Sequence, residues 1–349
     1  MKRFLSILLI GCLVLSLLAG CSAVQNPPAE ANADEQPQTP AVTSAGDSEA
    51  QVTPGSDANN NQSQVNLSVY ASFYPMYDFA VKIGGDKADV VNMVPAGTEP
   101  HDWEPTAADV AGLEQAAIFI YNGAGMEHWA EDVLESLQNK DLIAVEASKD
   151  IALMEGHHEH EGEEEEHEDE EEHEGEGFDP HVWLSPVNAK KEMENIKNAF
   201  VQADPDNEEY YEANYVKYAA DFDALDKEFQ DALSTLPKKD IIVSHEAFGY
   251  LCAAYGLNQI GIEGLAPDSE PDPARMAEII EFAKENDVKV IFFEELVSPK
   301  VSETIADAIG AQTAVLSPIE GLSDEQQAAG DDYFAVMRKN LEALKAALQ

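Results

Sequence analysis

The fold is decided by the stretch from Leu67 to Val94, which reads LSVYASFYPMYDFAVKIGGDKADVVNMV. A short apolar run at 67–72 is followed by a helical pattern at 75–83 and by a second apolar run at 90–94. Strand, helix and strand in this order are typical of a βαβ unit, whose strands lie parallel. The stretch therefore predicts an α/β fold built on a parallel sheet.

The same alternation continues through the rest of the chain. The further strands that we expect are 117–121, 142–147, 241–244, 259–263, 288–294 and 313–316. The further helices are expected at 107–114, 127–137, 246–255, 273–285, 300–309 and 331–348. Each half is about the size of one domain. The sequence thus predicts two α/β lobes, 67–184 and 238–349.

A helical segment, 185–237, lies between the two lobes. Ser185-Pro186 is typical of a helix start, with an N-cap residue and proline at the first helical position. Asp204-Pro205 repeats this signal and predicts a break or kink. Beyond it, apolar residues recur at helical spacing and indicate core packing: Tyr215, Tyr218, Phe222, Leu225, Phe229 and Leu236. We expect one long helix that crosses between the lobes as a stiff connector.

The amino end has the features of an export signal. Lys2 and Arg3 precede an apolar run at 4–20, which ends in Leu-Ala-Gly before Cys21. This ending resembles the bacterial lipobox and predicts removal of residues 1–20 and lipid attachment at Cys21. A transmembrane anchor is the alternative. Segment 21–66 has no aromatic residue and no Leu, Ile or Met, and is predicted to be a disordered tether.

Cysteine content and charge narrow the function further. With Cys12 in the signal and Cys21 acylated, only Cys252 remains as a thiol, so no internal disulfide is expected. The net charge of −48 excludes nucleic acid and anionic membrane surfaces as partners, because both need Lys and Arg. It suits a cation. Segment 155–176 alone holds fourteen carboxylates and no Lys or Arg, so the charge is unevenly spread, and the charge of that segment does not describe the whole fold.

Three histidines and one carboxylate occupy comparable places. His101 follows the strand at 90–94, and His245 directly follows the strand at 241–244. His181 lies where the first lobe meets the helical segment. Glu320 follows the last strand. Ligands of parallel α/β sheets bind beyond the carboxyl ends of the strands. Spacing alone does not establish that the four side chains converge, and each histidine taken alone is more often structural.

Four motifs contain these residues: PHDWEP at 100–105, DPHVWLSP at 179–186, VSHEAFGY at 243–250 and PIEGL at 318–322. Together they resemble the zinc- and manganese-binding lipoproteins of bacterial ABC transporters, from about Leu67 to the carboxyl end. The resemblance implies two (β/α)4-type lobes joined by a long rigid helix, with one metal ion in the cleft. Carried over by motif, its ligands are His101, His181, His245 and Glu320.

The resemblance also implies a function. The protein is expected to be a monomer, anchored by lipid on the outer face of the cell membrane, that binds Zn²⁺ with high affinity. It would deliver the ion to an ABC permease and its ATPase. Three imidazoles with one carboxylate favour zinc, whereas family members that bind manganese place a carboxylate where His245 stands. A manganese-binding homologue and a surface adhesion or metal-buffering lipoprotein are the alternatives.

The histidine- and acid-rich tract, a predicted loop of the first lobe at 155–177, is a second, weaker signal. Its five histidines could bind metal weakly and reversibly beside the main site: His157, His158, His160, His167 and His173. The simpler interpretation is a solvated charged loop, because so many like charges repel one another. The remaining histidine, His128, is expected on the helix at 127–137 beside Trp129, in a structural role.

A zinc hydrolase is the enzymatic alternative. His245-Glu246 begins like the metalloprotease motif His-Glu-x-x-His, but Gly249 stands where the second histidine must be. A catalytic zinc also keeps one position open for water, which Glu320 would fill. The sequence therefore predicts a binding protein and not an enzyme.

Overall fold

The computed structural model describes residues 66–156, 177–267 and 271–349. These residues fall in one compact unit that contains both predicted lobes. The predictions about the signal, Cys21 and nearly all of the tether lie outside the described residues, and so do those about the five histidines of the acidic tract.

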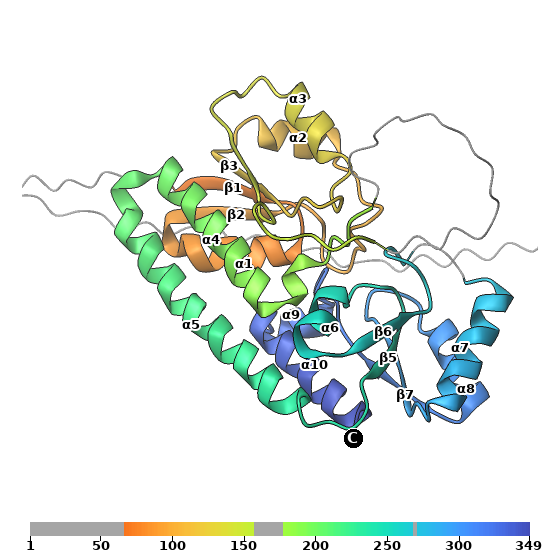
Figure 1. The fold of residues 1–349 in the computed structure, drawn as a ribbon. Helices are drawn as coiled ribbons and strands as arrows, with labels where there is room; N and C mark the ends of the chain where they lie inside the picture. Colours follow the sequence, from red (N-terminus) through yellow and green to blue (C-terminus); the bar gives the residue numbers. More distant parts are fainter. Residues whose placement is uncertain (1–65, 157–176, 268–270) are drawn as a thin grey trace, which may run out of the picture. The chain divides into compact units, whose positions relative to one another are not determined.

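The first lobe contains a sheet of four parallel strands in the order β2-β1-β3-β4 (Figure 1). Its strands are β1 (Leu67–Ala71), β2 (Ala88–Asn92), β3 (Ile118–Tyr121) and β4 (Ile143–Glu146). Three helices connect them: α1 (Tyr74–Gly84), α2 (Ala107–Leu113) and α3 (Ala130–Ser136). Residues Ile118 to Ile120 of β3 are fully buried, as expected for a strand covered on both faces.

The second lobe repeats this topology, with strand order β6-β5-β7-β8 and every pair parallel. Its strands are β5 (Asp240–Val243), β6 (Asn258–Gly261), β7 (Val290–Phe293) and β8 (Gln312–Val315). Its helices are α6 (Gly249–Tyr255), α7 (Pro273–Glu285), α8 (Lys300–Ile309), α9 (Asp324–Ala329) and α10 (Tyr333–Ala347). The predicted α/β class with two parallel sheets is confirmed.

Segment 185–237 holds two helices and not one. Helix α4 (Pro186–Ala203) ends at Asp204, a short 3₁₀ turn follows at Pro205–Asn207, and α5 (Glu208–Leu233) runs back beside α4 (Figure 1). The ion pairs Lys190–Asp223 and Lys197–Glu212, both at 2.6 Å, join the two helices in antiparallel order. The chain breaks here because Pro205 has no N–H for a continuing helix. Helix α5 therefore crosses between the lobes, while α4 packs against β3 and β4.

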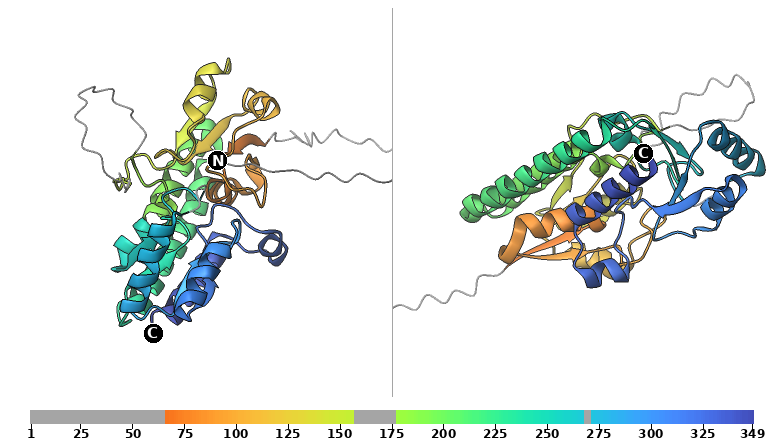
Figure 2. Two further views of the ribbon diagram at one scale, coloured as in Figure 1. Left: turned by 90° about the vertical axis from the view of Figure 1, so that its right-hand side faces the viewer. Right: turned by 90° about the horizontal axis from the view of Figure 1, so that it is seen from below.

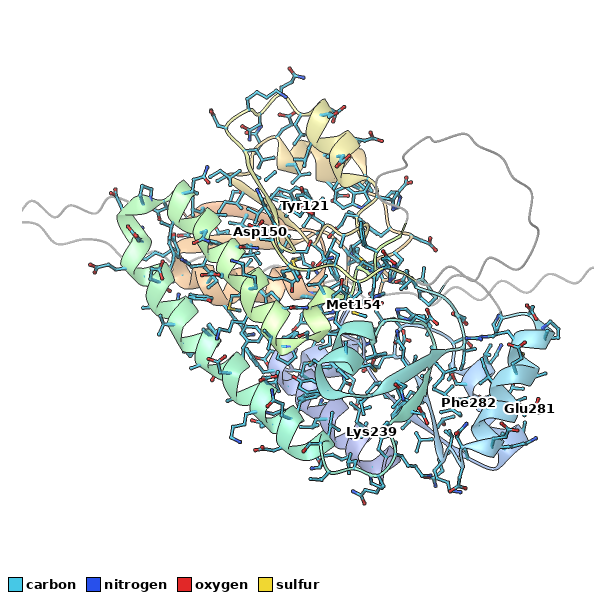
Figure 3. All side chains as sticks on the ribbon, in the orientation of Figure 1. Tyr121, Asp150, Met154, Lys239, Glu281 and Phe282 are labelled. Atoms are coloured by element: carbon cyan, nitrogen blue, oxygen red, sulfur yellow. The ribbon has the colours of Figure 1, made fainter. Side chains whose placement is uncertain are left out.

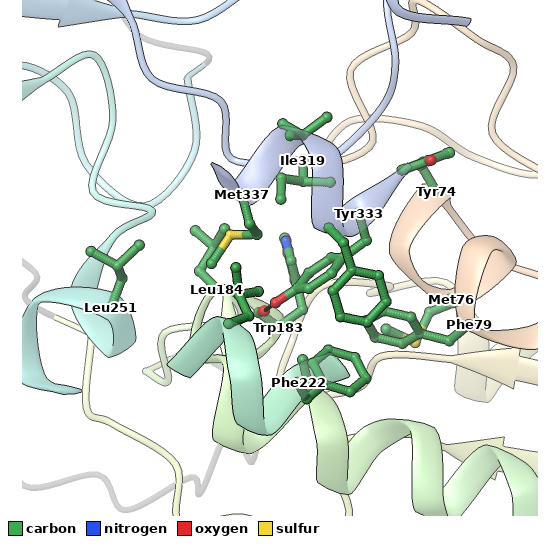
Figure 4. Close-up of a cluster of buried hydrophobic side chains, with 14 of the residues drawn as sticks. Tyr74, Met76, Phe79, Trp183, Leu184, Phe222, Leu251, Ile319, Tyr333 and Met337 are labelled. Carbon is green, nitrogen blue, oxygen red and sulfur yellow. Dashed lines mark hydrogen bonds between the residues drawn. The ribbon is translucent and has the colours of Figure 1, made fainter. Parts of the chain in front are cut away.

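The core continues from one lobe to the other. Phe79 of α1, Phe222 of α5 and Tyr333 of α10 pack with ring centroids 5.1–5.7 Å apart (Figure 4). The Tyr333 hydroxyl donates to the carbonyl oxygen of Trp183 at 2.6 Å, where the first lobe meets α4. Helix α5 also runs beside α10 (Figure 2), so both helices tie the lobes together.

A second junction lies at the end of the first lobe. The backbone N–H of Met154, labelled in Figure 3, donates to the hydroxyl of Tyr250 on α6 at 2.9 Å. The same hydroxyl donates to the carbonyl oxygen of Asp179 at 2.9 Å.

Within the described part of the chain, no helix combines the length and apolar character that a membrane span requires.

Helices α3, α6 and α10 begin later than the sequence predicts, α10 at Tyr333 and not at 331, and one helix was missed. Helix α3 begins at Ala130, because the Glu127 carboxylate accepts hydrogen bonds from the backbone N–H groups of Asn122 and Gly123 and stays in the preceding turn. His128 is therefore not helical. Helix α6 begins at Gly249 and not at Glu246. Helix α9 was missed, although Ser323 and Gln326 form a capping box that signals its start.

Candidate metal centre

The four candidate ligands lie on loops at the carboxyl ends of the strands. His101 is in the loop from β2 to α2, and His181 precedes the 3₁₀ turn Val182–Leu184 that leads into α4. His245 follows β5, and Glu320 follows β8. Parallel sheets direct these loops to one edge, and the two edges face each other across the lobe boundary. This topology explains how residues far apart in the sequence can meet.

The side chains converge on one point. The Nε2 atom of His181 lies 3.3 Å from that of His101 and 3.2 Å from that of His245. Glu320 Oε1 lies 3.3 Å, 3.1 Å and 3.3 Å from the Nε2 atoms of His101, His181 and His245. All four donor atoms lie within 4.8 Å of one another.

These separations match a small tetrahedral ion. Zinc–nitrogen bonds of about 2.0–2.1 Å place neighbouring donor atoms of a regular tetrahedron about 3.3–3.4 Å apart. Five of the six donor–donor distances are between 3.1 and 3.3 Å. Three imidazole nitrogens and one carboxylate oxygen are also a donor set that suits Zn²⁺. The cluster can therefore hold one zinc ion with little rearrangement.

Burial differs among the four residues. The side chains of His181 and His245 are 0 % exposed and that of Glu320 is 3 % exposed, whereas that of His101 is 10 % exposed. Its backbone N–H donates to the Glu99 carboxylate at 3.0 Å, which fixes the loop. His101 thus closes the site on its most accessible side.

Two carboxylates orient the buried imidazoles. His181 Nδ1 lies 2.8 Å from Asp179 Oδ1, and His245 Nδ1 lies 2.8 Å from Glu294 Oε1. A carboxylate can only accept, so Nδ1 carries the proton and the Nε2 lone pair faces the other donors. Sequence analysis missed both carboxylates. The sequence carried a signal for Asp179, which lies within the DPHVWLSP motif. Glu294 directly follows β7, and only the structure shows that β7 lies beside β5.

The electrostatics of the site follow from this arrangement. Burial by itself raises the pKa of Glu320, but the three imidazoles outweigh burial and hold that pKa well below its usual range. Burial lowers the pKa of His245, but Glu294 and Glu320 outweigh it and raise that pKa well above its usual value. The pKa of His181 is raised against burial in the same way, by Asp179 and Glu320. In the metal-free protein, these shifts favour a second proton on His181 and on His245, and a bound cation would displace that proton.

His128 takes no part in this cluster. Its side chain is 54 % exposed, and its Nε2 atom lies 3.7 Å from a carboxylate oxygen of Glu104. Its exposure does not support the structural role predicted from the sequence.

The chain has the architecture of a two-lobed, substrate-binding protein that binds metal. Each lobe has a parallel four-stranded sheet, a helix crosses between the lobes, and three imidazoles and a carboxylate meet between them. The chain belongs to the ZnuA family, described as zinc-uptake complex component A, periplasmic, whose model matches residues 69–347. This family consists of transporter components and not of enzymes. The resemblance drawn from the four motifs is confirmed.

Several characterised proteins are similar to this chain. It is 49 % identical over 282 residues to the high-affinity zinc uptake system protein ZnuA of Bacillus subtilis, covering 81 % of this chain and 88 % of the relative. It is 41 % identical over 288 residues to the zinc-binding lipoprotein AdcA of Streptococcus pneumoniae, covering 82 % of this chain but only 57 % of AdcA. The chain thus spans a little over half the length of AdcA.

Solved structures agree with the sequence relatives. The Zn(II)-bound ZnuA-like domain of Streptococcus pneumoniae AdcA superposes with a TM-score of 0.69 at 38 % identity, covering 81 % of this chain and 99 % of that domain. The laminin-binding protein Lmb of Streptococcus agalactiae, described as a bifunctional protein with adhesin and metal-transporting activity, superposes with a TM-score of 0.72 at 32 % identity. That match covers 82 % of this chain and 100 % of Lmb.

Proposed function

We propose that this protein captures Zn²⁺ outside the cytoplasm and delivers it to an ABC permease and its ATPase. The observation that carries the proposal is the convergence of three Nε2 atoms and one carboxylate oxygen at the spacing of a tetrahedral zinc site. Relatives named for zinc uptake and zinc binding support the same cargo. Zinc is here the transported substrate and not a resident cofactor.

In this proposal His101, His181, His245 and Glu320 are the zinc ligands. His101 belongs to the first lobe, 67–184, and His245 and Glu320 to the second, 238–349, with 185–237 as the connector. A zinc ion would then bridge the lobes. Three nitrogen donors favour zinc over manganese, which prefers more oxygen.

The amino end and the acidic tract supply the rest of the proposal. Lipid on Cys21 would hold the protein at the outer face of the membrane, as a monomer on the tether 21–66. The Leu-Ala-Gly-Cys ending supports this anchor, and so do relatives named lipoproteins. The five histidines of 157–176 would bind additional zinc weakly beside the main site.

The test is metal loading of the purified protein and of single variants. Equimolar Zn²⁺ and Mn²⁺ should yield about one tightly held zinc per chain by elemental analysis after gel filtration. His101→Ala, His181→Ala and His245→Ala should each lose tight binding, since each removes one of four bonds. His128→Ala is the matched control and should retain tight binding. Wild-type affinity in the three site variants would refute the ligand assignment.

A second function is favoured by the structural match to Lmb, which is described as having adhesin activity. An adhesin would bind immobilised laminin, with or without zinc. Cells that lack only zinc uptake should recover growth when zinc is added, whereas loss of adhesion should persist. This pair of measurements separates the two functions.

A further inference from the structure

The residue before Glu320 has an unusual backbone. Among the residues that the structure describes, four other than glycine have a positive φ: Ala124, Asp150, Asp287 and Ile319. Ile319, at φ 62°, is the β-branched one of the four. For a β-branched residue this left-handed conformation is a genuine outlier, because its side chain crowds the backbone. Such conformations persist where the surrounding structure holds them, and they concentrate at functional sites.

Buried contacts hold Ile319 in this conformation. Its side chain is 0 % exposed and packs in the core near Met337 and Tyr333 (Figure 4). The carbonyl oxygen before it, on Pro318, accepts a hydrogen bond from the Trp183 indole at 2.7 Å.

The other side of the turn is tied to α10. The Asn340 side chain accepts from the backbone N–H of Ser317 at 2.9 Å and donates to the Ser317 carbonyl oxygen at 2.7 Å. The backbone N–H of Ile319 donates to the Ser317 hydroxyl at 3.3 Å. The turn is therefore fixed from both lobes.

A different conformation at residue 319 would move the carboxylate. The dihedral angles of Ile319 set the direction in which Glu320 leaves the turn, and in the observed direction Oε1 lies within 3.3 Å of the Nε2 atoms of all three imidazoles. Glu320 also lines a cavity of about 470 Å³, together with Tyr74, Asn92 and Asp331. Free space therefore adjoins Glu320.

We propose that Ile319 is a positioning residue of the metal site, whose left-handed backbone directs the Glu320 carboxylate toward the three imidazoles while its buried side chain holds that backbone in place. This inference rests on the proposed function, because it assumes that Glu320 is a zinc ligand. It gives Ile319 a role in metal binding that its position in the core does not suggest.

The test compares Ile319→Ala with Ile319→Gly. Both variants remove the buried side chain and should lower the melting temperature of the zinc-free protein. They differ in that the Cβ of alanine disfavours the left-handed conformation, whereas glycine adopts it freely. Ile319→Ala should therefore bind zinc about tenfold more weakly than Ile319→Gly. Ala and Gly substitutions of Ile305, buried in α8, are the matched control and should show no such difference in affinity.

Two further readouts separate positioning from packing. In the Co²⁺-loaded protein, the visible absorption of Ile319→Ala should shift further toward that of Glu320→Gln than the absorption of Ile319→Gly does. In a Glu320→Gln background the difference in zinc affinity between the Ala and Gly variants should disappear. If Ile319→Ala does not fold, Ile319→Leu should bind zinc more tightly than Ile319→Val, because leucine is not β-branched.

Equal zinc affinity of the Ala and Gly variants would overturn the inference, as would a difference that persists without the Glu320 carboxylate. If Glu320→Gln itself changed neither the affinity nor the Co²⁺ spectrum, the proposed fourth ligand would be wrong and the inference would fall with it. If Glu320→Gln changes the zinc affinity or the Co²⁺ spectrum while the Ala and Gly variants of Ile319 bind zinc equally, the inference about Ile319 is refuted. The assignment of Glu320 as the fourth ligand then stands.

Discussion

Asp179 and Glu294 each accept a hydrogen bond from the Nδ1–H group of a buried histidine. Substitutions at these two carboxylates therefore test most directly how the site is organised. Asp179→Asn and Glu294→Gln keep the shape of the side chain but remove the charge that holds the proton on Nδ1. Each should weaken zinc binding about 10- to 100-fold, measured by competition with a chromophoric chelator. Glu104→Gln, at the exposed His128, is the control and should leave the affinity unchanged. Unchanged affinity in the first two variants would show that the imidazoles are oriented by packing alone.

The raised pKa values of His181 and His245 predict how zinc binding depends on pH. Protonated imidazoles stabilise the metal-free fold below the ordinary histidine pKa of about 6.5, and this stability is lost as pH rises through the higher folded values. Zinc needs the same nitrogens without protons, so it competes best above the folded pKa values. The rise in melting temperature on adding zinc should be largest at alkaline pH and should begin to shrink above pH 6.5 during acidification. If the zinc-induced rise in melting temperature began to shrink only well below pH 6.5, the raised pKa values of His181 and His245 would be contradicted.

At the scale of elements, a cap in the sequence made helix boundaries predictable where a clear helical pattern accompanied it, whereas the short helix α9 was missed despite its capping box. Helices α7 and α8 have the predicted bounds, because Asp272 caps the start of α7 and Gly310 ends α8 in a left-handed conformation. Helix α3 starts late because Glu127 bonds to the backbone of its own turn. That contact depends on the tertiary fold and leaves no periodic signal.

The same distinction holds for the site. The four candidate ligands lie in motifs that a family resemblance identifies. Glu294 could not be predicted as the partner of His245, because that pairing depends on β7 lying beside β5. The periodicity of a local stretch of sequence does not reveal the order of the strands within a sheet.

The acidic tract can be removed without straining the elements around it. The backbone N–H of Gly156 donates to the carbonyl oxygen of Gly177, and Glu155 forms a β-bridge with Phe178, so the ends of 157–176 meet. Deleting 157–176 should leave one tight zinc site and remove the weak ones, measured as stoichiometry by calorimetric titration. Replacing only the five histidines of the tract with alanine is the control and should give the same stoichiometry. Loss of the tight site in either variant would mean that the primary ligands are misassigned.

At the scale of the whole molecule, one buried carboxyl group should lower stability. Glu192 on α4 is 0 % exposed, and neither carboxyl oxygen has a hydrogen-bond partner among the described residues. Burial, with a contribution from Glu127, raises the pKa of Glu192 well above its usual value. The folded chain keeps this proton while the unfolded chain releases it above about pH 4.5, so the fold loses stability as pH rises.

Glu192→Gln should therefore raise the melting temperature at pH 7 and have little effect near pH 4, measured on the zinc-free protein. Glu194→Gln, on the same helix, is the control. A hydrogen bond from Lys191 lowers the pKa of Glu194, so its loss should not stabilise the protein. A lower melting temperature for Glu192→Gln at pH 7 would show that ionised Glu192 is stabilised in the fold.

The connection between the lobes predicts how far they move. Helix α5 spans both lobes and packs through Phe222 against Tyr333 of α10, and the Arg338 guanidinium pairs with Glu228 at 2.9 Å. Wide hinge closure needs a few loop residues that absorb large dihedral changes, whereas this connector is a packed helix. Small-angle scattering of residues 66–349, with and without zinc, should therefore show little change in the radius of gyration. A His245→Ala sample with zinc is the control for nonspecific metal effects. A large compaction on binding, present in the wild type and absent in the control, would refute the rigid connector.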